Sequence, residues 1–269
     1  PIRAIKACES CYNPSPPRED YVESRGSSES RVVLVTGASQ GLGRAIAVGF
    51  GAIGARVVVN YRTHADEADR TVKAVEDAGG SAFAYQADVR YAKNVAAMVS
   101  AAVDRWHRLD VLVCNAAASD DSLLLRLSDE AWDRVLATNL TGVFLCLQSA
   151  GAVMQAQGDG SVILIGSFSA LQGRAGQAPY AAAKAGLLGL LRSVAPEWGP
   201  ANVRVNMVLP GWHATALTGY RDDPAPAPFG PALGRGATMN AVAAFVVALA
   251  AMRDVSGQVF NLDSRIPPF

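Results

Sequence analysis

The chain lacks three features that would assign it to a special class of protein: an excess of charge of one sign, a membrane-length apolar run and a dense set of cysteines. Its 24 basic and 24 acidic residues balance, so no nucleic-acid or anionic-membrane partner is expected. The longest apolar run, Ala241 to Met252, falls short of the roughly 20 residues that span a bilayer. This run is expected to be a core helix.

The four cysteines do not predict a disulfide framework. Cys114 and Cys146 lie inside apolar segments, which favours a reducing, cytoplasmic compartment. The pair Cys8-x-x-Cys11 is not followed by a second pair, and a structural zinc site needs four ligands, so no metal is expected. Free thiols or an arm that docks a partner are the alternatives for this pair.

Residues 1–30 differ from the rest of the chain because they are rich in Pro, Ser, Glu and Arg and show little apolar periodicity. They are expected to form a flexible N-terminal extension, and they lack the apolar segment of a secretory signal. Residues 31–269 are expected to form one domain, since half of the 269 residues are hydrophobic and can bury one large core.

From residue 31 onward, strand and helix patterns alternate, which predicts an α/β fold with parallel strands and helices on both faces of one sheet. The predicted strands are 31–36, 55–60, 81–86, 109–114, 161–166, 202–208 and 258–262. The predicted helices are 42–53, 64–78, 91–107, 128–156, 179–199 and 239–252.

A glycine-rich segment follows the first strand and leads directly into the first helix. It contains Gly37, Gly41 and Gly43. Glycines let the backbone approach a pyrophosphate, and the start of a helix offers unpaired N–H groups, so this order predicts a phosphate site. A plain tight turn is the alternative, but the flanking strand and helix supply the context that the motif requires.

Tyr180 and Lys184 lie four residues apart and therefore on one face of a helix. A cation held near a phenol favours the phenolate and lowers its pKa, which would suit proton transfer to a substrate oxygen. Taken alone, the pair is more typical of an ordinary half-buried helix face.

Together, these motifs resemble the short-chain dehydrogenase/reductase family, and the resemblance extends over about residues 31–263. Further matches follow the predicted strands: Asp88-Val89, Asn115-Ala116-Ala117, Asn139, Ser167 and Pro210-Gly211. The resemblance implies a doubly wound Rossmann fold with seven parallel strands. It also implies a cofactor site made of Gly37, Ser39, Gln40, Gly41, Leu42, Gly43, Tyr61, Arg62, Asp88, Val89, Asn115, Ala116, Ala117, Tyr180, Lys184, Pro210, Gly211 and Thr215.

The resemblance further implies that Asn139, Ser167, Tyr180 and Lys184 are the catalytic residues. Tyr180 would donate a proton to the carbonyl oxygen while hydride reaches the carbon, and Ser167 would hold that oxygen. Lys184 would bind the nicotinamide ribose and lower the pKa of the tyrosine. Asn139 would hold a water that feeds protons to the lysine. When each residue is considered by itself, there is an alternative to its catalytic role: Ser167 would be a turn residue at the end of a strand, and Asn139 would be a buried amide bonded to backbone.

The choice of cofactor is expected to depend on the end of the second strand. An acidic side chain there accepts the ribose hydroxyls of NAD, whereas an arginine accommodates the 2′-phosphate of NADP. Tyr61 stands at the usual acidic position and Arg62 follows it, so NADP(H) is the expected cofactor. A solvated loop arginine is the alternative.

The chain departs from the family pattern at three places. Ala117 stands where glycine is usual, and its methyl group would approach the adenosine ribose. His213 replaces an aliphatic residue two positions before Thr215, where it would titrate near pH 6–7 or be an exposed bystander. Asp263-Ser264-Arg265 replaces the usual Asp-Gly-Gly near the site.

Three short stretches resemble the corresponding region of β-ketoacyl-acyl-carrier-protein reductases: Asp121-Ser122-Leu123-Leu124-Leu125-Arg126, Glu130-Ala131-Trp132-Asp133 and Asn139-Leu140. This resemblance implies reduction of a 3-oxoacyl thioester. A reductase of free ketones or of secondary-metabolite intermediates is the second hypothesis, because the expected lid over about 212–238 is proline-rich and carries Asp222 and Asp223. A catalytically idle NADP-binding sensor or scaffold is the third. The apolar helices 128–156 and 179–199 are expected to form a subunit interface, and the family suggests a homotetramer.

Overall fold

A computed structural model describes residues 30–213 and 232–265 of the chain. In this part, seven parallel strands form one sheet in the order β3-β2-β1-β4-β5-β6-β7. The strands are β1 (Val32–Val35), β2 (Arg56–Tyr61), β3 (Ser81–Gln86), β4 (Val111–Cys114), β5 (Gly160–Ile165), β6 (Val203–Leu209) and β7 (Val259–Asn261). The prediction of a doubly wound seven-stranded Rossmann fold is therefore confirmed.

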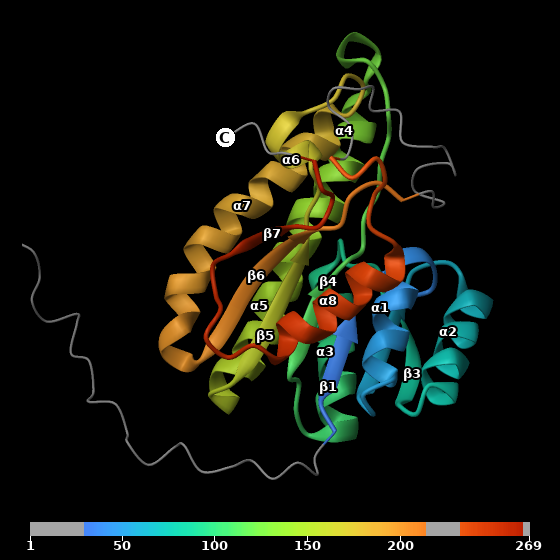
Figure 1. The fold of residues 1–269 in the computed structure, drawn as a ribbon, viewed down its shortest axis with the longest axis vertical. Coiled ribbons are helices and arrows are strands. Elements are labelled where there is room, and N and C mark those ends of the chain that lie inside the picture. Colours follow the sequence, from blue (N-terminus) through green and yellow to red (C-terminus); the bar gives the residue numbers. More distant parts are fainter. Residues whose placement is uncertain (1–29, 214–231, 266–269) are drawn as a thin grey trace, which may run out of the picture.

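Helices cover both faces of the sheet (Figure 1). The core on one face is built from α3 (Ala92–Trp106), α5 (Gly142–Gln157) and α7 (Ala178–Trp198). The core on the other face is built from α1 (Gly41–Gly51), α2 (Ala65–Asp77) and α8 (Met239–Ala251). The helices α1 and α8 are far apart in the sequence but lie side by side on the same face of the sheet (Figure 1).

The two central strands β1 and β4 are apolar at every position because both of their faces are buried. In β1, Val32 and Leu34 belong to one core, whereas Val33 and Val35 belong to the other. This alternation follows from the two-residue period of a strand, and all four side chains are 0% exposed. In β1, Val33 pairs with Val57 of β2 on one side and with Val111 of β4 on the other.

The predicted long helix over 128–156 is interrupted in the structure. It consists of α4 (Asp129–Leu136), a π-helical segment η2 (Ala137–Thr141) and α5. Such π-helical turns accommodate an inserted residue and are frequent at functional sites. The Thr138 hydroxyl bonds the carbonyl of Arg134 at 2.9 Å, and Asn139 bonds the loop after β4.

The whole stretch Asp129–Gln157 is also long and apolar enough to cross a membrane, judged by length and composition. Half of its most apolar part is buried inside the protein. Val143, Cys146 and Leu147 of α5 pack into the core on their face of the sheet. These contacts account for its apolar composition as a core helix.

Three short elements were not expected from the sequence: η1 (Leu124–Arg126), α6 (Ser169–Gln172) and η3 (Gly199–Ala201). Residues 1–29, with Cys8 and Cys11, lie outside the described residues, as do Thr215 and most of the expected lid.

Candidate active site

A cavity of about 660 Å³ lies at the carboxyl ends of the strands, where the strand order reverses between β1 and β4. Such a reversal leaves a crevice beyond the strand ends, because the loops after the two neighbouring strands run to opposite faces of the sheet. All the described residues of the expected site line this cavity except Asn139. The structure therefore brings together residues that span the chain from Gly37 to Gly211.

The glycine-rich turn leaves no room for side chains at two positions. Gly37 has a φ of +62°, and a Cβ there would lie 2.9 Å from the Cα of Ala116. A Cβ on Gly43 would lie 2.4 Å from the carbonyl oxygen of Gly37. Helix α1 begins at Gly41 without a capping side-chain bond, and its first residues line the cavity. This cradle fits a dinucleotide, because it presents free N–H groups to a pyrophosphate.

Three polar side chains hold the turn in place. The Asn115 amide donates to the carbonyls of Thr36 at 2.9 Å and Gly37 at 3.0 Å, and the Thr36 hydroxyl accepts the backbone N–H groups of Asn115 and Ala116. The buried Asn60 accepts the N–H of Gly37 at 3.1 Å and donates to Ala87 at 3.0 Å. Sequence reasoning missed Asn60, although an amide that ends a run of valines signals a buried polar role.

Tyr180, Lys184 and Ser167 meet at one wall of the cavity. Burial raises the pKa of Tyr180 to about 12, and a hydrogen bond with Ser167 opposes that rise. The Lys184 ammonium is buried, lies 5.7 Å from the centroid of the Tyr180 ring and donates to the carbonyl of Ile165 at 2.7 Å. Burial lowers the pKa of Lys184 to about 8.

These pKa values correct one sequence-based expectation. A lysine was expected to lower the tyrosine pKa, but in this structure the pKa of Tyr180 is raised and Lys184 is not among its causes. The reason is that both groups are withdrawn from water, which favours the neutral form of each.

Asn139 does not reach the cavity. Its side chain is 0% exposed, and both ends of its amide bond the backbone of Ala118, each at 2.8 Å. The amide thus ties the π-helical segment to the loop after β4. The Asn139 side chain is therefore bonded to backbone, which was the alternative to a role in holding water. The water-holding role stays a prediction.

The adenosine end of the expected cofactor site carries Arg62. The Arg62 side chain is exposed at the cavity and makes no hydrogen bond or ion pair with the described residues. Half-buried Tyr61 precedes it. Asp88 binds Arg90 through two guanidinium nitrogens, at 3.0 and 2.6 Å, and this bonding lowers the pKa of the Asp88 carboxyl.

The departures from the family pattern also lie at the cavity. His213 bonds the carbonyl of Pro210 at 3.1 Å, and burial lowers the pKa of its imidazole below the ordinary 6.5. Burial therefore favours the neutral form of this imidazole. Arg265 lines the cavity, packs over the Phe168 ring at 4.7 Å and forms an ion pair with buried Asp263. Ala117 lines it as well.

Sequence reasoning also missed four residues that line the substrate half of the cavity: Asp121, Arg174, Gln177 and Trp212. Arg174 and Gln177 fall between Ser167 and Tyr180, and Trp212 follows Gly211. Their closeness in sequence to motif residues could have indicated that they line the site. In the described ranges, no group of three or more His, Cys, Asp or Glu side chains is arranged to hold a metal.

A doubly wound sheet with this glycine cradle and a Tyr–Lys–Ser wall defines a nicotinamide-dinucleotide oxidoreductase. The family model described as short chain dehydrogenase matches residues 31–225, and the chain belongs to this family. The family implies NAD or NADP as the cofactor.

Similar proteins are reductases and dehydrogenases. The chain is 40% identical over 243 residues to a 3-oxoacyl-[acyl-carrier-protein] reductase of Synechocystis sp., a match that covers 89% of this chain and 98% of the relative. It is 40% identical over 194 residues to the Staphylococcus aureus reductase FabG, covering 72% and 79%. A crystal structure described as a short-chain alcohol dehydrogenase of Sinorhizobium meliloti matches with a TM-score of 0.77 and 32% identity, covering 88% and 96%.

Proposed function

We propose that the protein reduces a ketone to a secondary alcohol with NADPH, and that the ketone is a 3-oxoacyl thioester. The observation that carries this proposal is that Ser167, Tyr180 and Lys184 line the same cavity as the glycine cradle. The curated relatives at 40% identity are named for this reaction, which supports the choice of substrate.

Tyr180 is the proton donor. A pKa of about 12 keeps its hydroxyl protonated at neutral pH, so that it can donate to the substrate oxygen. Ser167 bonds Tyr180 and accepts the backbone N–H of Ser169 at 3.1 Å, which orients its hydroxyl toward the reacting oxygen. The bound nicotinamide would supply the hydride.

Lys184 compensates for the buried phenolate that proton donation leaves behind. With a pKa of about 8 the ammonium is charged at neutral pH, and a charge in a low-dielectric site acts strongly on its neighbours. The bond to Ile165 fixes the ammonium on the tyrosine side of the cavity. Lys184 also hydrogen-bonds the ribose of the cofactor in this proposal.

NADP(H) is favoured over NAD(H) by Arg62. Its exposed guanidinium at the end of β2 offers donors to a 2′-phosphate, and no acidic side chain stands at Tyr61 to accept ribose hydroxyls. The residues of the glycine turn, Asp88-Val89, Asn115 to Ala117 and Pro210-Gly211 complete the cofactor site, together with Thr215.

The test is NADPH oxidation with purified protein over a panel of 3-oxoacyl thioesters and free ketones, with Tyr180→Phe as the blank. Turnover of a thioester that the blank lacks supports the proposal. Tight NADPH binding without turnover of any ketone would instead support the sensor or scaffold alternative.

A reductase of free ketones, including secondary-metabolite intermediates, is the second candidate. The sequence Arg221-Asp222-Asp223 in the expected lid favours it, because two carboxylates oppose docking of an acidic carrier protein. In the same panel, a higher kcat/KM for free ketones than for carrier-bound thioesters would select this candidate.

The protein is proposed to act as a cytoplasmic homotetramer through α5 and α7. Phe144 on α5 is 45% exposed, and α7 presents Ala182 and Gly189, which allow a close approach of another chain. Light scattering at micromolar concentration tests this, and a monomer would contradict it. Removal of residues 1–30 is expected to leave assembly and activity unchanged, because Ser30 directly precedes the fold.

A further inference from the structure

Arg174 stands at the substrate half of the cavity in an unusual setting. Its guanidinium lies over the Trp212 ring, 5.1 Å from the centroid, and both residues line the cavity. Arg174 belongs to the loop between α6 and α7, whereas Trp212 follows β6, so the contact joins two segments across the cavity. The Arg174 guanidinium makes no hydrogen bond or ion pair with residues 30–213 or 232–265, while the backbone carbonyl of Arg174 accepts the N–H of Gln177 at 3.0 Å.

A cation–π contact over an aromatic ring takes none of the guanidinium N–H groups into a hydrogen bond with an oxygen acceptor. The N–H donors point outward in the plane of the group, where they match the oxygens of a carboxylate or phosphate. The indole also limits the positions that the long side chain adopts, so less freedom is lost when an anion binds.

The other charged side chains on this half of the cavity have direct partners. Arg265 is paired with Asp263, which is 1% exposed, and its Nε bonds the carboxylate at 2.6 Å. Asp121 accepts a hydrogen bond from Gln177 at 3.3 Å and another from Ser119. Among the described residues, Arg174 is thus a charged group at this half of the cavity whose guanidinium donors have no protein acceptor.

The Arg174 loop is also held at the cavity. Ser122 donates its backbone N–H to the carbonyl of Gly176 at 2.9 Å, which links this loop to the segment after β4. The Gln177 side chain donates a hydrogen bond to Asp121, which joins the same two segments a second time. It also accepts a hydrogen bond from the hydroxyl of Ser169 at 3.2 Å. The loop therefore has a defined position next to Tyr180.

We infer that Arg174 is a specificity-determining residue that binds an anionic group of the ketone substrate, an inference that rests on the proposed reductase activity. Tyr180 and Ser167 engage the carbonyl, and Arg174 binds the acidic group at another point of the same cavity. That group is the carboxylate of a free 3-oxo acid or a phosphate of a pantetheine-linked thioester.

Two matched substrate pairs distinguish these sources. Acetoacetate and ethyl acetoacetate differ in the carboxylate, while acetoacetyl-CoA and the N-acetylcysteamine thioester of acetoacetate differ in the phosphates. Each is assayed with NADPH in the parent, in Arg174→Gln and in Arg174→Lys. Arg192→Gln, at an exposed position of α7 outside the cavity lining, is the matched control.

We expect Arg174→Gln to lower kcat/KM for the anionic member of one pair by about tenfold to a hundredfold, mainly through KM. The neutral member and NADPH binding should change by less than about twofold, and the control should match the parent. Arg174→Lys should retain part of the preference, because it keeps the charge but loses the planar donors. The pair that responds identifies the source of the anion.

An unchanged ratio of anionic to neutral substrate in Arg174→Gln, with active parent protein, would overturn this inference and leave the proposed reduction standing. An equal loss on both members of each pair would overturn it too, because that pattern is a general defect of the loop. No turnover of any of the four substrates by the parent would overturn the proposed function and this inference with it.

Discussion

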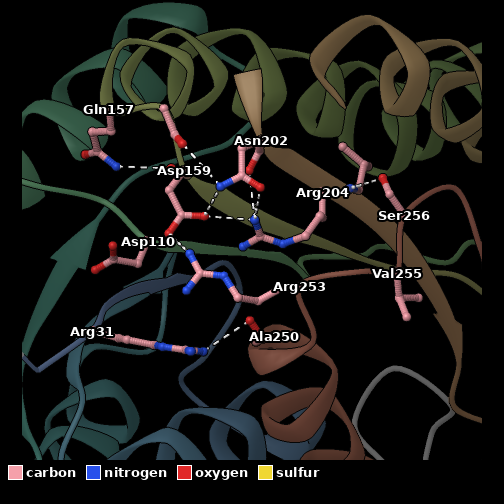
Figure 2. A network of polar contacts seen from close by, with 12 residues as sticks. Arg31, Asp110, Gln157, Asp159, Asn202, Arg204, Ala250, Arg253, Val255 and Ser256 are labelled. Carbon is pink, nitrogen blue, oxygen red and sulfur yellow. Dashed lines mark hydrogen bonds and ion pairs between the residues drawn. The ribbon is translucent and has the colours of Figure 1, made fainter. Parts of the chain in front are cut away.

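The two edges of the sheet differ in how some of their charged side chains are paired. At the amino ends of β4, β5 and β6, acidic and basic side chains bind one another in a network (Figure 2). At the carboxyl ends, the cationic side chains of Arg62 and Arg174 lie at a cavity without a hydrogen-bonding partner among the described residues.

The amino-end network is centred on Asp159, which directly precedes β5. It bonds Arg204 at 2.8 Å, lies 3.5 Å from Arg253 and accepts the amide of Asn202 at 3.2 Å (Figure 2). Arg204 is 8% exposed, and its buried Nε has no hydrogen-bond partner. Most charged side chains of this network bind other side chains of the protein, and these contacts stabilise the fold.

This difference between the two edges indicates which charged side chains are available to bind a ligand. At the cavity edge, the exposed guanidinium groups of Arg62 and Arg174 carry donors that no described residue binds, so a ligand can complete them. We therefore expect substitutions at the cavity edge to change activity with little loss of stability, and substitutions at the amino edge to do the reverse.

The largest effect is expected for Tyr180→Phe. Removal of the transferable proton should lower kcat by about a hundredfold to ten-thousandfold, with the melting temperature and NADPH binding nearly unchanged. Steady-state kinetics, thermal unfolding and cofactor fluorescence measure these three outcomes. Turnover within about tenfold of the parent would remove Tyr180 from the role of the acid.

Asp159→Ala tests the opposite edge. It leaves Arg204 buried with less compensation, so the free energy of unfolding should fall by about 3 kcal/mol while kcat/KM stays near that of the parent. Urea unfolding measures the loss. Arg253→Gln is the control, since its side chain is 63% exposed and its removal should cost less than about 1 kcal/mol. Equal losses in the two variants would refute the central role of Asp159.

Arg62→Ala should abolish the preference for NADPH over NADH, which we expect to be about tenfold to a hundredfold in the parent. The preference should weaken with salt, because an exposed contact is screened over a Debye length of about 8 Å at physiological ionic strength. A combined Tyr61→Asp and Arg62→Ala variant should prefer NADH. Equal Michaelis constants for both cofactors in the parent would contradict NADP selectivity.

Lys184→Met should change how stability depends on pH. The pKa of Lys184 is lowered from 10.5 to about 8 by folding, so between these values the unfolded chain binds more protons at this site. The free energy of unfolding of the parent should therefore rise with pH in this window, by up to about 1.4 kcal/mol per pH unit relative to the variant. Denaturant unfolding at pH 7, 8, 9 and 10 measures the difference, and parallel curves would refute the lowered pKa.

The sheet and most of the cavity could be predicted because both follow from local patterns. Runs of valine before the motif residues predicted the buried strands, and parallel strands bring their carboxyl ends to one edge. The glycine turn was predictable for a related reason, since the chain must pass close to Ala116 at Gly37.

The parts that could not be predicted depend on contacts between distant segments. The π-helical turn at Ala137–Thr141 interrupts an apolar pattern that reads as one helix, and it is braced by the loop after β4 through Asn139. The Arg174–Trp212 contact joins residues 38 positions apart with no motif to connect them. The pKa of Tyr180 depends on burial, which spacing along the sequence does not reveal.

The placement of Arg265 has a practical consequence for handling the protein. This residue lines the cavity and packs over the Phe168 ring, so a label or a bulky substitution at Arg265 would enter the space expected for the substrate. Ser30, by contrast, precedes β1 at the amino edge of the sheet, at the opposite end of the strands from the cavity. Labelling at the amino edge of the sheet, rather than at Arg265, is therefore the arrangement that leaves the cavity open.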